Sequence, residues 1–124
     1  MTAKILLVED NESIRKVVRA TLELDSYEVI EAADGMKGLR MLERNPDCAL
    51  VITDLAMPVM DGYEFLARVR GDMGLQDLPV FVLTAEKDAT AALDKGATRL
   101  IRKPFLPIEL LESVRRAIQP PKPK

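Results

Sequence analysis

Carboxylates close the two most apolar runs in the first half of the chain. Glu9 and Asp10 follow the run 4–8, and Asp54 follows the run 48–53. A carboxylate at the end of a buried strand is costly unless a cation pairs with it. Oxygen ligands without a histidine or a nearby cysteine favour Mg²⁺ over a transition metal. The pattern predicts a cation site. Without the cation, repulsion among the three carboxylates should raise the pKa of at least one of them.

Two further polar residues follow later segments that are expected to be strands. Thr84 comes after 79–83, and Lys103 comes after 98–102. If these strand ends meet at one edge of a parallel sheet, the Lys103 ammonium and the Thr84 hydroxyl can contact the same phosphoryl group. A carboxylate nucleophile, a divalent cation, an ammonium and a hydroxyl are the groups needed to form an aspartyl phosphate. The hypothesis from the residues is therefore a phosphorylated Asp54.

Each residue also has a purely structural interpretation. Glu9 and Asp10 are common types at a solvated helix start. Asp54 could cap a turn, Thr84–Ala85 could cap a helix, and Lys103–Phe105 could be a plain strand exit. Their shared position at one sheet edge favours a functional site over four unrelated structural roles.

Short apolar runs alternate with amphipathic segments along the chain, which predicts repeated βα units. Strands are expected near 4–8, 27–32, 49–53, 79–83 and 98–102, and helices near 12–24, 35–44, 62–73, 86–95 and 107–118. The third and fourth strands are almost continuously apolar, which is typical of central parallel strands, and the fifth is polar enough for an edge. The prediction is an α/β fold with an open, doubly wound, five-stranded parallel sheet and helices on both faces.

The bulk properties restrict the class of protein. A chain of 124 residues with 48% hydrophobic and 31% charged residues fits one globular domain. Its net charge of −2 gives no global attraction to nucleic acid or to an anionic membrane. Without a signal peptide or a membrane-length apolar run, a cytoplasmic location is expected. The domain is expected over 1–119, with 120–124 a Pro/Lys-rich tail or the start of a linker.

Over residues 4–118 the sequence resembles the receiver domain of bacterial two-component response regulators, and the chemotaxis receivers in particular. The resemblance rests on four motifs in order and at family-like spacing: Val8–Asn11, Asp54–Pro58 with Asp61–Gly62, Thr84–Ala85, and Lys103–Phe105. It implies a flavodoxin-like sheet with the strand order 2-1-3-4-5.

The resemblance also implies the chemistry. Asp54 would accept a phosphoryl group from a histidine kinase or a histidine phosphotransfer protein. Mg²⁺, with Mn²⁺ as a substitute, would be held by four groups: Asp10, Asp54, the backbone carbonyl of Ala56, and Glu9 through water. Such a protein is a phosphoacceptor switch that catalyses its own phosphorylation and a slow dephosphorylation, rather than an enzyme with a separate substrate.

The same resemblance implies how the signal leaves the site. Lys103 would contact the phosphoryl group, Thr84 would move toward it, and the surface of helix four, strand five and helix five would change. That surface would serve a downstream protein or an output domain in a longer chain, with no direct binding of nucleic acid or membrane. The switch region would include Ala85, and the Lys103–Pro104 peptide is expected to be cis.

Two features depart from the family pattern. Leu100 stands where receivers usually carry the Tyr or Phe whose ring follows the threonine. The stretch 84–96 is also about three residues shorter than usual, which leaves Glu86–Lys95 for a short helix that depends on packing. We therefore expect phosphorylation to change the order or position of this helix, in place of an aromatic flip.

Three alternatives remain. A receiver-like adaptor that is never phosphorylated usually lacks the acidic pocket or the lysine, and both are present here. A Mg²⁺-dependent aspartyl-phosphate phosphatase usually carries a second Asp two residues after the nucleophile, where this chain has Ala56. A nucleotide or flavin site would need a glycine cluster after Val8, which is absent.

Overall fold

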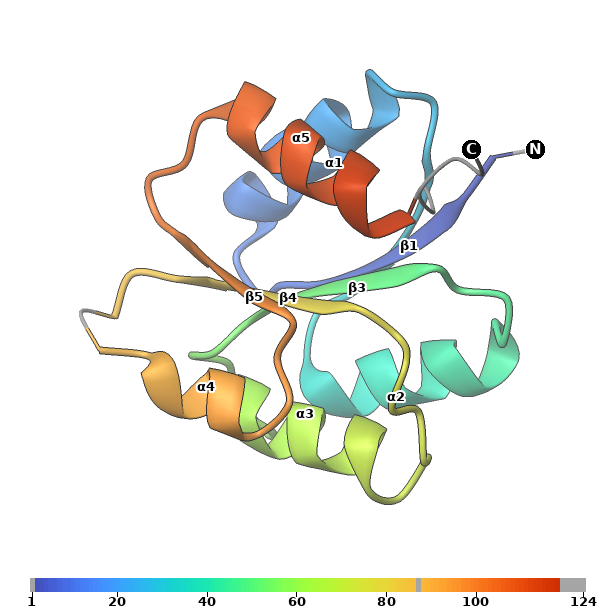
Figure 1. Cartoon of the computed structure of the whole chain (residues 1–124), viewed down its shortest axis with the longest axis vertical. Coiled ribbons are helices and arrows are strands. Elements are labelled where there is room, and N and C mark those ends of the chain that lie inside the picture. Colours follow the sequence, from blue (N-terminus) through green and yellow to red (C-terminus); the bar gives the residue numbers. More distant parts are fainter. Residues whose placement is uncertain (1, 87, 119–124) are drawn as a thin grey trace, which may run out of the picture.

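A parallel five-stranded sheet lies between two layers of helices in the computed structural model (Figure 1). The structure describes residues 2–86 and 88–118. The strands are β1 (Lys4–Val8), β2 (Glu28–Ala32), β3 (Leu50–Asp54), β4 (Val80–Thr84) and β5 (Arg99–Arg102). The helices are α1 (Glu12–Glu23), α2 (Gly35–Arg44), α3 (Gly62–Arg70), α4 (Thr90–Asp94) and α5 (Pro107–Ile118). The predicted α/β class and the strand order β2-β1-β3-β4-β5 are confirmed.

The sheet separates two apolar clusters. Helices α1 and α5 cover one face, and α2, α3 and α4 cover the other (Figure 1). Leu7 and Ile52 point into the first cluster, and Val8 and Val51 point into the second. Every residue of β3 and β4 is buried, which explains their continuous apolar sequence.

Acidic and amide side chains cap the helices that follow β1 and β3. Asn11 Oδ1 accepts from Ile14 N at 3.0 Å and begins α1. Asp61 Oδ1 accepts from Glu64 N at 2.9 Å and begins α3. These caps fix where the loops after β1 and β3 end, and so how far the site carboxylates extend beyond the sheet.

The predicted element boundaries hold to within one residue in most places, but two helices differ. Asp54 and Thr84 are the last residues of β3 and β4 rather than the first residues after them. Helix α3 ends at Arg70 instead of residue 73, because Gly71 starts a turn that continues to Gly74 at φ +66°.

The prediction of a helix over Glu86–Lys95 is wrong at its start. Helix α4 covers Thr90–Asp94 alone, and residues 85, 86, 88 and 89 are not helical. Asp88 Oδ1 accepts from the Thr90 hydroxyl at 2.8 Å, and this local turn competes with helix formation. Arg102 Nη1 donates to the Glu86 carbonyl at 2.6 Å, which removes an acceptor that a longer helix would use.

Arg70 ties the end of α3 to the chain that follows α4. Its Nη1 donates to the carbonyls of Leu75 and Leu78 at 2.6 and 2.5 Å. Its Nε and Nη2 both donate to the Gly96 carbonyl, at 3.0 and 2.7 Å. This guanidinium therefore holds the turn between α4 and β5 against α3.

Within the part of the chain that is described, no helix combines the length and apolar character needed to cross a bilayer. The Pro/Lys-rich segment 120–124 lies outside the described residues.

Candidate functional site

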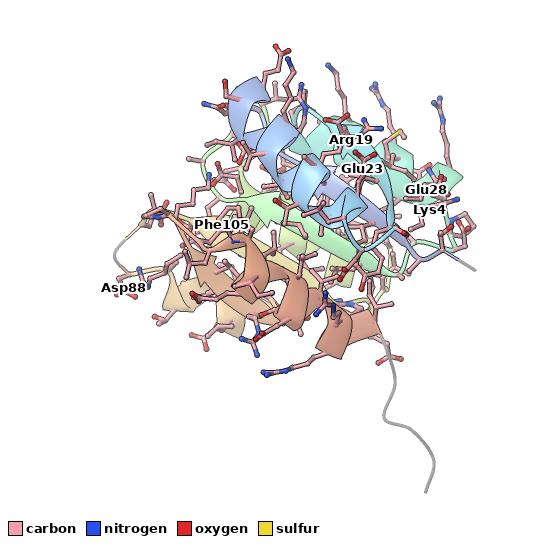
Figure 2. The ribbon with its side chains drawn as sticks, turned by 90° about the horizontal axis from the view of Figure 1, so that it is seen from above. Lys4, Arg19, Glu23, Glu28, Asp88 and Phe105 are labelled. Carbon is pink, nitrogen blue, oxygen red and sulfur yellow. The ribbon has the colours of Figure 1, made fainter. Side chains whose placement is uncertain are left out.

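The parallel register brings the predicted site residues to one edge of the sheet. Val8 pairs with Thr53 in the β1–β3 ladder, so Glu9 and Asp10 lie beside Asp54. One carboxylate oxygen from each of these three residues lies within 4.8 Å of the other two. In Figure 2, Phe105 and Asp88 lie at this end of the molecule, opposite Lys4 and Glu28. The predicted clustering of the three carboxylates is borne out.

The Asp54 carboxylate is held on both oxygens. Oδ1 accepts from Leu55 N at 2.7 Å, with Ala56 N at 3.4 Å. Oδ2 lies 3.0 Å from Lys103 Nζ. Asp54 is 9% exposed, so the carboxylate is reachable from one side while its orientation is fixed by the backbone of its own loop.

Glu9 is the most buried carboxyl group of the site, at 1% exposure. Its Oε2 accepts from Asn11 N at 3.1 Å, and its Oε1 lies 3.2 Å from Lys103 Nζ. Burial raises the pKa of Glu9 to about 7; the Asn11 N–H opposes this, the charge of Asp54 adds to it, and Lys103 opposes it. The expected raised pKa is present, but burial causes more of it than repulsion does.

The Lys103 ammonium lies at this edge of the sheet, as the sequence predicted. Burial acts to lower the pKa of its ammonium, but contacts with Asp54 and Glu9 outweigh that effect and raise the pKa. The ammonium therefore stays charged between the two carboxylates. The backbone N–H of Lys103 donates to the Thr84 carbonyl at 2.8 Å. The Lys103–Pro104 peptide is cis, as the resemblance implied.

Thr84 is buried at the end of β4, next to the other site strands. Its hydroxyl oxygen accepts from Glu86 N at 3.0 Å, so its own proton remains available for a phosphoryl oxygen. Ala85 lies between these residues and is exposed. Leu100 is half-buried and packs on the same apolar cluster as Tyr63.

Glu86 forms a junction that the sequence did not predict. Its backbone N–H donates to the Thr84 hydroxyl oxygen, and its carbonyl accepts from Arg102. Its carboxylate lies 3.5 Å from the Tyr63 hydroxyl. Tyr63 belongs to α3 and Arg102 to β5, so the contacts arise only when three distant segments fold together. No sequence pattern signals such a junction.

The three carboxylates fit a divalent cation. Oxygen ligands of Mg²⁺ lie about 2.1 Å from the metal, so opposite ligands are about 4.2 Å apart. The oxygens of Glu9, Asp10 and Asp54 within 4.8 Å of one another need only small adjustments to meet that spacing. Asp10 is exposed, which leaves room for water in the remaining positions. Ala56 lies two residues after Asp54 and is exposed, and its carbonyl stays a predicted ligand.

The comparisons with known proteins decide the family. The family model of the response regulator receiver domain matches residues 5–115. The chain belongs to the receiver domain family. Receiver domains are the phosphoacceptor signalling modules of two-component systems.

Relatives of this receiver domain include short and long proteins. It is 34% identical over 115 residues to the chemotaxis protein CheY1 of Helicobacter pylori, covering 90% of this chain and 93% of that protein. It is 37% identical over 127 residues to the response regulator MprA of Mycobacterium tuberculosis, covering all of this chain but 54% of that protein.

A solved structure of a receiver domain is similar in fold. The receiver domain of the sensor histidine kinase PA1611 from Pseudomonas aeruginosa superposes with a TM-score of 0.87 at 31% identity, covering 95% of this chain and 98% of that one. That structure has a magnesium ion coordinated in its active-site cleft.

Proposed function

We propose that this receiver domain is a Mg²⁺-dependent phosphoacceptor switch in which Asp54 is the phosphorylated residue. The observation that carries the proposal is the position of Asp54, between the carboxylates of Glu9 and Asp10 and the ammonium of Lys103. Carboxylates that gather a cation and an ammonium that faces the nucleophile together neutralise an incoming phosphoryl group.

In the proposed reaction, a carboxylate oxygen of Asp54 forms a bond to phosphorus as the bond from phosphorus to the donor histidine nitrogen breaks. The electron pair of that bond stays on the imidazole, which then takes up a proton. Lys103 moves its contact from Asp54 to one phosphoryl oxygen, and the Thr84 hydroxyl donates a hydrogen bond to another. A bound Mg²⁺, held by Asp10, Asp54, the Ala56 carbonyl and, through water, Glu9, would neutralise further phosphoryl charge.

A hollow beside Lys103 supports a protein as the donor. Its volume is about 510 Å³, and its lining is mainly apolar: Ser13, Ile14, Val17, Ala85, Lys103, Pro104 and Phe105. Val17 is 56% exposed and adds apolar surface to this hollow. A histidine kinase or phosphotransfer protein docked here would present its phosphohistidine directly to the site.

The contacts of Glu86 support an output through the loop before α4. Movement of Thr84 toward a phosphoryl group would disturb the Glu86 N–H, and with it the contacts to Arg102 and Tyr63. The change would reach the surface of α4, β5 and α5 even though position 100 carries a leucine in place of the usual aromatic residue. This chain spans about half of MprA, so an output domain in a longer chain is one recipient and a separate protein is the other.

Intact-mass measurement after incubation with acetyl phosphate and Mg²⁺ tests the proposal. We expect one added phosphoryl group in the wild type and none in Asp54→Asn. The control Asp61→Asn removes a nearby carboxylate that caps α3 and should keep the adduct. The absence of an adduct under all conditions, including with a phosphorylated phosphotransfer protein, would favour the adaptor alternative. An adduct that still forms in Asp54→Asn would show that a residue other than Asp54 accepts the phosphoryl group.

A further inference from the structure

Helix α2 carries a row of cations that the phosphoacceptor site does not use. Lys37, Arg40 and Arg44 are spaced three and four residues apart, which places them on one face of the helix. All three are exposed, and none of their side chains forms an ion pair or hydrogen bond with a described residue. By contrast, Arg15 and Arg19 on α1 both pair with Glu31.

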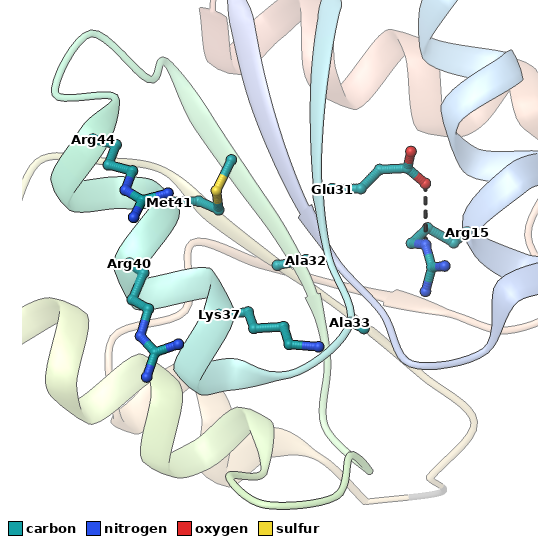
Figure 3. Close-up of a pocket in the computed structure, with 8 residues that line it drawn as sticks. All are labelled: Arg15, Glu31, Ala32, Ala33, Lys37, Arg40, Met41 and Arg44. Carbon is teal, nitrogen blue, oxygen red and sulfur yellow. Dashed lines mark hydrogen bonds and ion pairs between the residues drawn. The ribbon is translucent and has the colours of Figure 1, made fainter.

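These cations border a groove at the open edge of the sheet. The groove has a volume of about 430 Å³ and runs past the end of β2 (Figure 3). Lys37, Arg40 and Arg44 lie on its α2 side, and the Arg15–Glu31 pair lies on its α1 side (Figure 3). The lining contains four cationic side chains and one carboxylate, a net charge of +3. The groove is therefore strongly positive on a chain whose net charge is −2.

The floor of the groove is an unpaired strand edge. Among the described strands, β2 is hydrogen-bonded to β1 alone. Glu28 N donates to Ala3, and the Ala32 carbonyl accepts from Glu9 N. Alternate residues of a parallel strand bond the same neighbour, so the peptide groups of Val29 and Glu31 face outward. Such an edge accepts an additional strand through its main-chain groups.

We propose that this groove binds an extended acidic segment of a partner protein. The segment would pair with the outward peptide groups of β2 and place its carboxylates against Lys37, Arg40 and Arg44. From Lys37 to Arg44 the helix rises about 10 Å. Three carboxylates at alternate positions of a strand span about 13 Å. The flexible stems of the three cations accommodate this difference.

The groove suits a peptide better than nucleic acid or a small anion. No aromatic side chain lines it, so bases would have no surface on which to stack. Its three cations on α2, which pair with no described residue, are exposed rather than buried, so they recognise charge and not the shape of one anion. The net negative charge of the whole chain repels a long polyanion but affects a short local segment less.

Fluorescence anisotropy at low salt tests the proposal. The probe is a labelled ten-residue peptide in which Glu and Thr alternate. We expect the triple variant K37Q/R40Q/R44Q to bind it about tenfold or more weakly. The matched control K95Q/R99Q/R116Q removes the same charge from exposed positions directly after α4, on β5 and on α5, and should change the affinity by less than about twofold. Far-UV circular dichroism verifies that both variants are folded.

Two further probes test whether the ligand pairs with β2 and whether the groove prefers a peptide to nucleic acid. A peptide of the same sequence with an N-methyl group on every residue should lose binding, because neither of its edges can donate a hydrogen bond to β2. An oligothymidine of ten nucleotides should bind more weakly than the peptide. The proposal fails if the Glu/Thr peptide does not bind, or if both triple variants lose the same affinity for it. It also fails if the N-methyl peptide binds as well as the unmodified one, or if the oligothymidine binds more tightly. Asp54 takes part in none of these measurements, so their outcome is independent of the proposed phosphorylation.

Discussion

Lys103 Nζ lies 3.0 Å from Oδ2 of Asp54, although 49 residues separate them in sequence. The same ammonium lies 3.2 Å from Glu9. Asp10 completes the carboxylate group and forms no ion pair with a described residue. One ammonium therefore faces three carboxyl groups, and this excess of negative charge governs how the site responds to cations and protons.

The first prediction concerns Asp10. Because Asn removes one of the repelling charges, Asp10→Asn should raise the free energy of unfolding without Mg²⁺ by about 1 kcal/mol. The wild type should gain stability when MgCl₂ is added, and the variant should lose most of that gain. Urea denaturation with and without MgCl₂ measures both effects. Glu112→Gln, on the exposed face of α5, is the control and should follow the wild type. A destabilised Asp10→Asn would contradict the prediction.

The second prediction concerns pH. The pKa of Glu9 is raised from 4.5 to about 7, so the folded state holds this proton more tightly than the unfolded state. Without Mg²⁺, the stability from Glu9 is complete below pH 4.5 and is lost as the pH rises through about 7. Affinity for Mg²⁺ should rise over the same window, because the metal requires the carboxylate. Denaturation and Mg²⁺ titration across this range should show both trends, and Glu9→Gln should flatten them. If Glu9→Gln shows the same pH profiles as the wild type, the pH dependence comes from a titratable group other than Glu9.

The third prediction concerns Gly62, the first residue of α3. A Cβ at this position would lie 2.3 Å from the Asp54 carbonyl oxygen and 2.7 Å from Leu55 Cα. Since backbone cannot move aside cheaply, Gly62→Ala should destabilise the fold by about 3 kcal/mol or more. Gly74→Asn is the control, because its Cβ meets open space and Asn tolerates φ +66°. Chemical denaturation compares them, and similar midpoints for the two variants would refute the steric argument.

The fourth prediction contrasts two arginines on α3. Arg70→Met leaves the carbonyls of Leu75, Leu78 and Gly96 without their donor, which should cost about 2 to 3 kcal/mol. Arg68→Met removes an exposed pair with Glu64 and should change stability by less than about 0.5 kcal/mol. Urea denaturation ranks the two. If Arg68→Met proves as costly as Arg70→Met, the carbonyl contacts are not the reason.

The fifth prediction concerns the short helix α4. Five residues and a single fully buried side chain, Ala92, give it little stability of its own. We expect amide hydrogen exchange across 85–97 to change when a phosphate mimic such as beryllofluoride binds with Mg²⁺. The control is Asp54→Asn with the same reagents, in which exchange should not change. Unchanged protection across this segment in the wild type would contradict an output through α4.

The ends of β1, β3 and β4 could be predicted because each lies at an abrupt change of polarity. In β3 and β4 both faces are buried, so the apolar runs stop where Asp54 and Thr84 begin the open edge. The clustering of Asp10, Asp54 and Lys103 then follows from parallel pairing alone. The Mg²⁺ ligands, the phosphoryl donor and the domain limits stay predictions.

The start of α4 could not be predicted because the forces that decide it come from elsewhere in the fold. Glu86 and Ala89 favour a helix by intrinsic propensity. Arg102, which takes the Glu86 carbonyl, reaches that position only after β5 has paired with β4. The same holds for Tyr63, whose contact with Glu86 joins residues 23 positions apart. Local sequence patterns do not contain such long-range competition.

The strand order has a consequence for assembly. Strands β2 and β5 form opposite edges of the sheet, with three strands between them. At about 4.8 Å per strand the two edges are about 19 Å apart. A protein bound along β2 and one bound over β5 would therefore not collide at the sheet. Under the two proposals above, the domain could bind two partners at once, one at the surface that phosphorylation of Asp54 would change and one along β2.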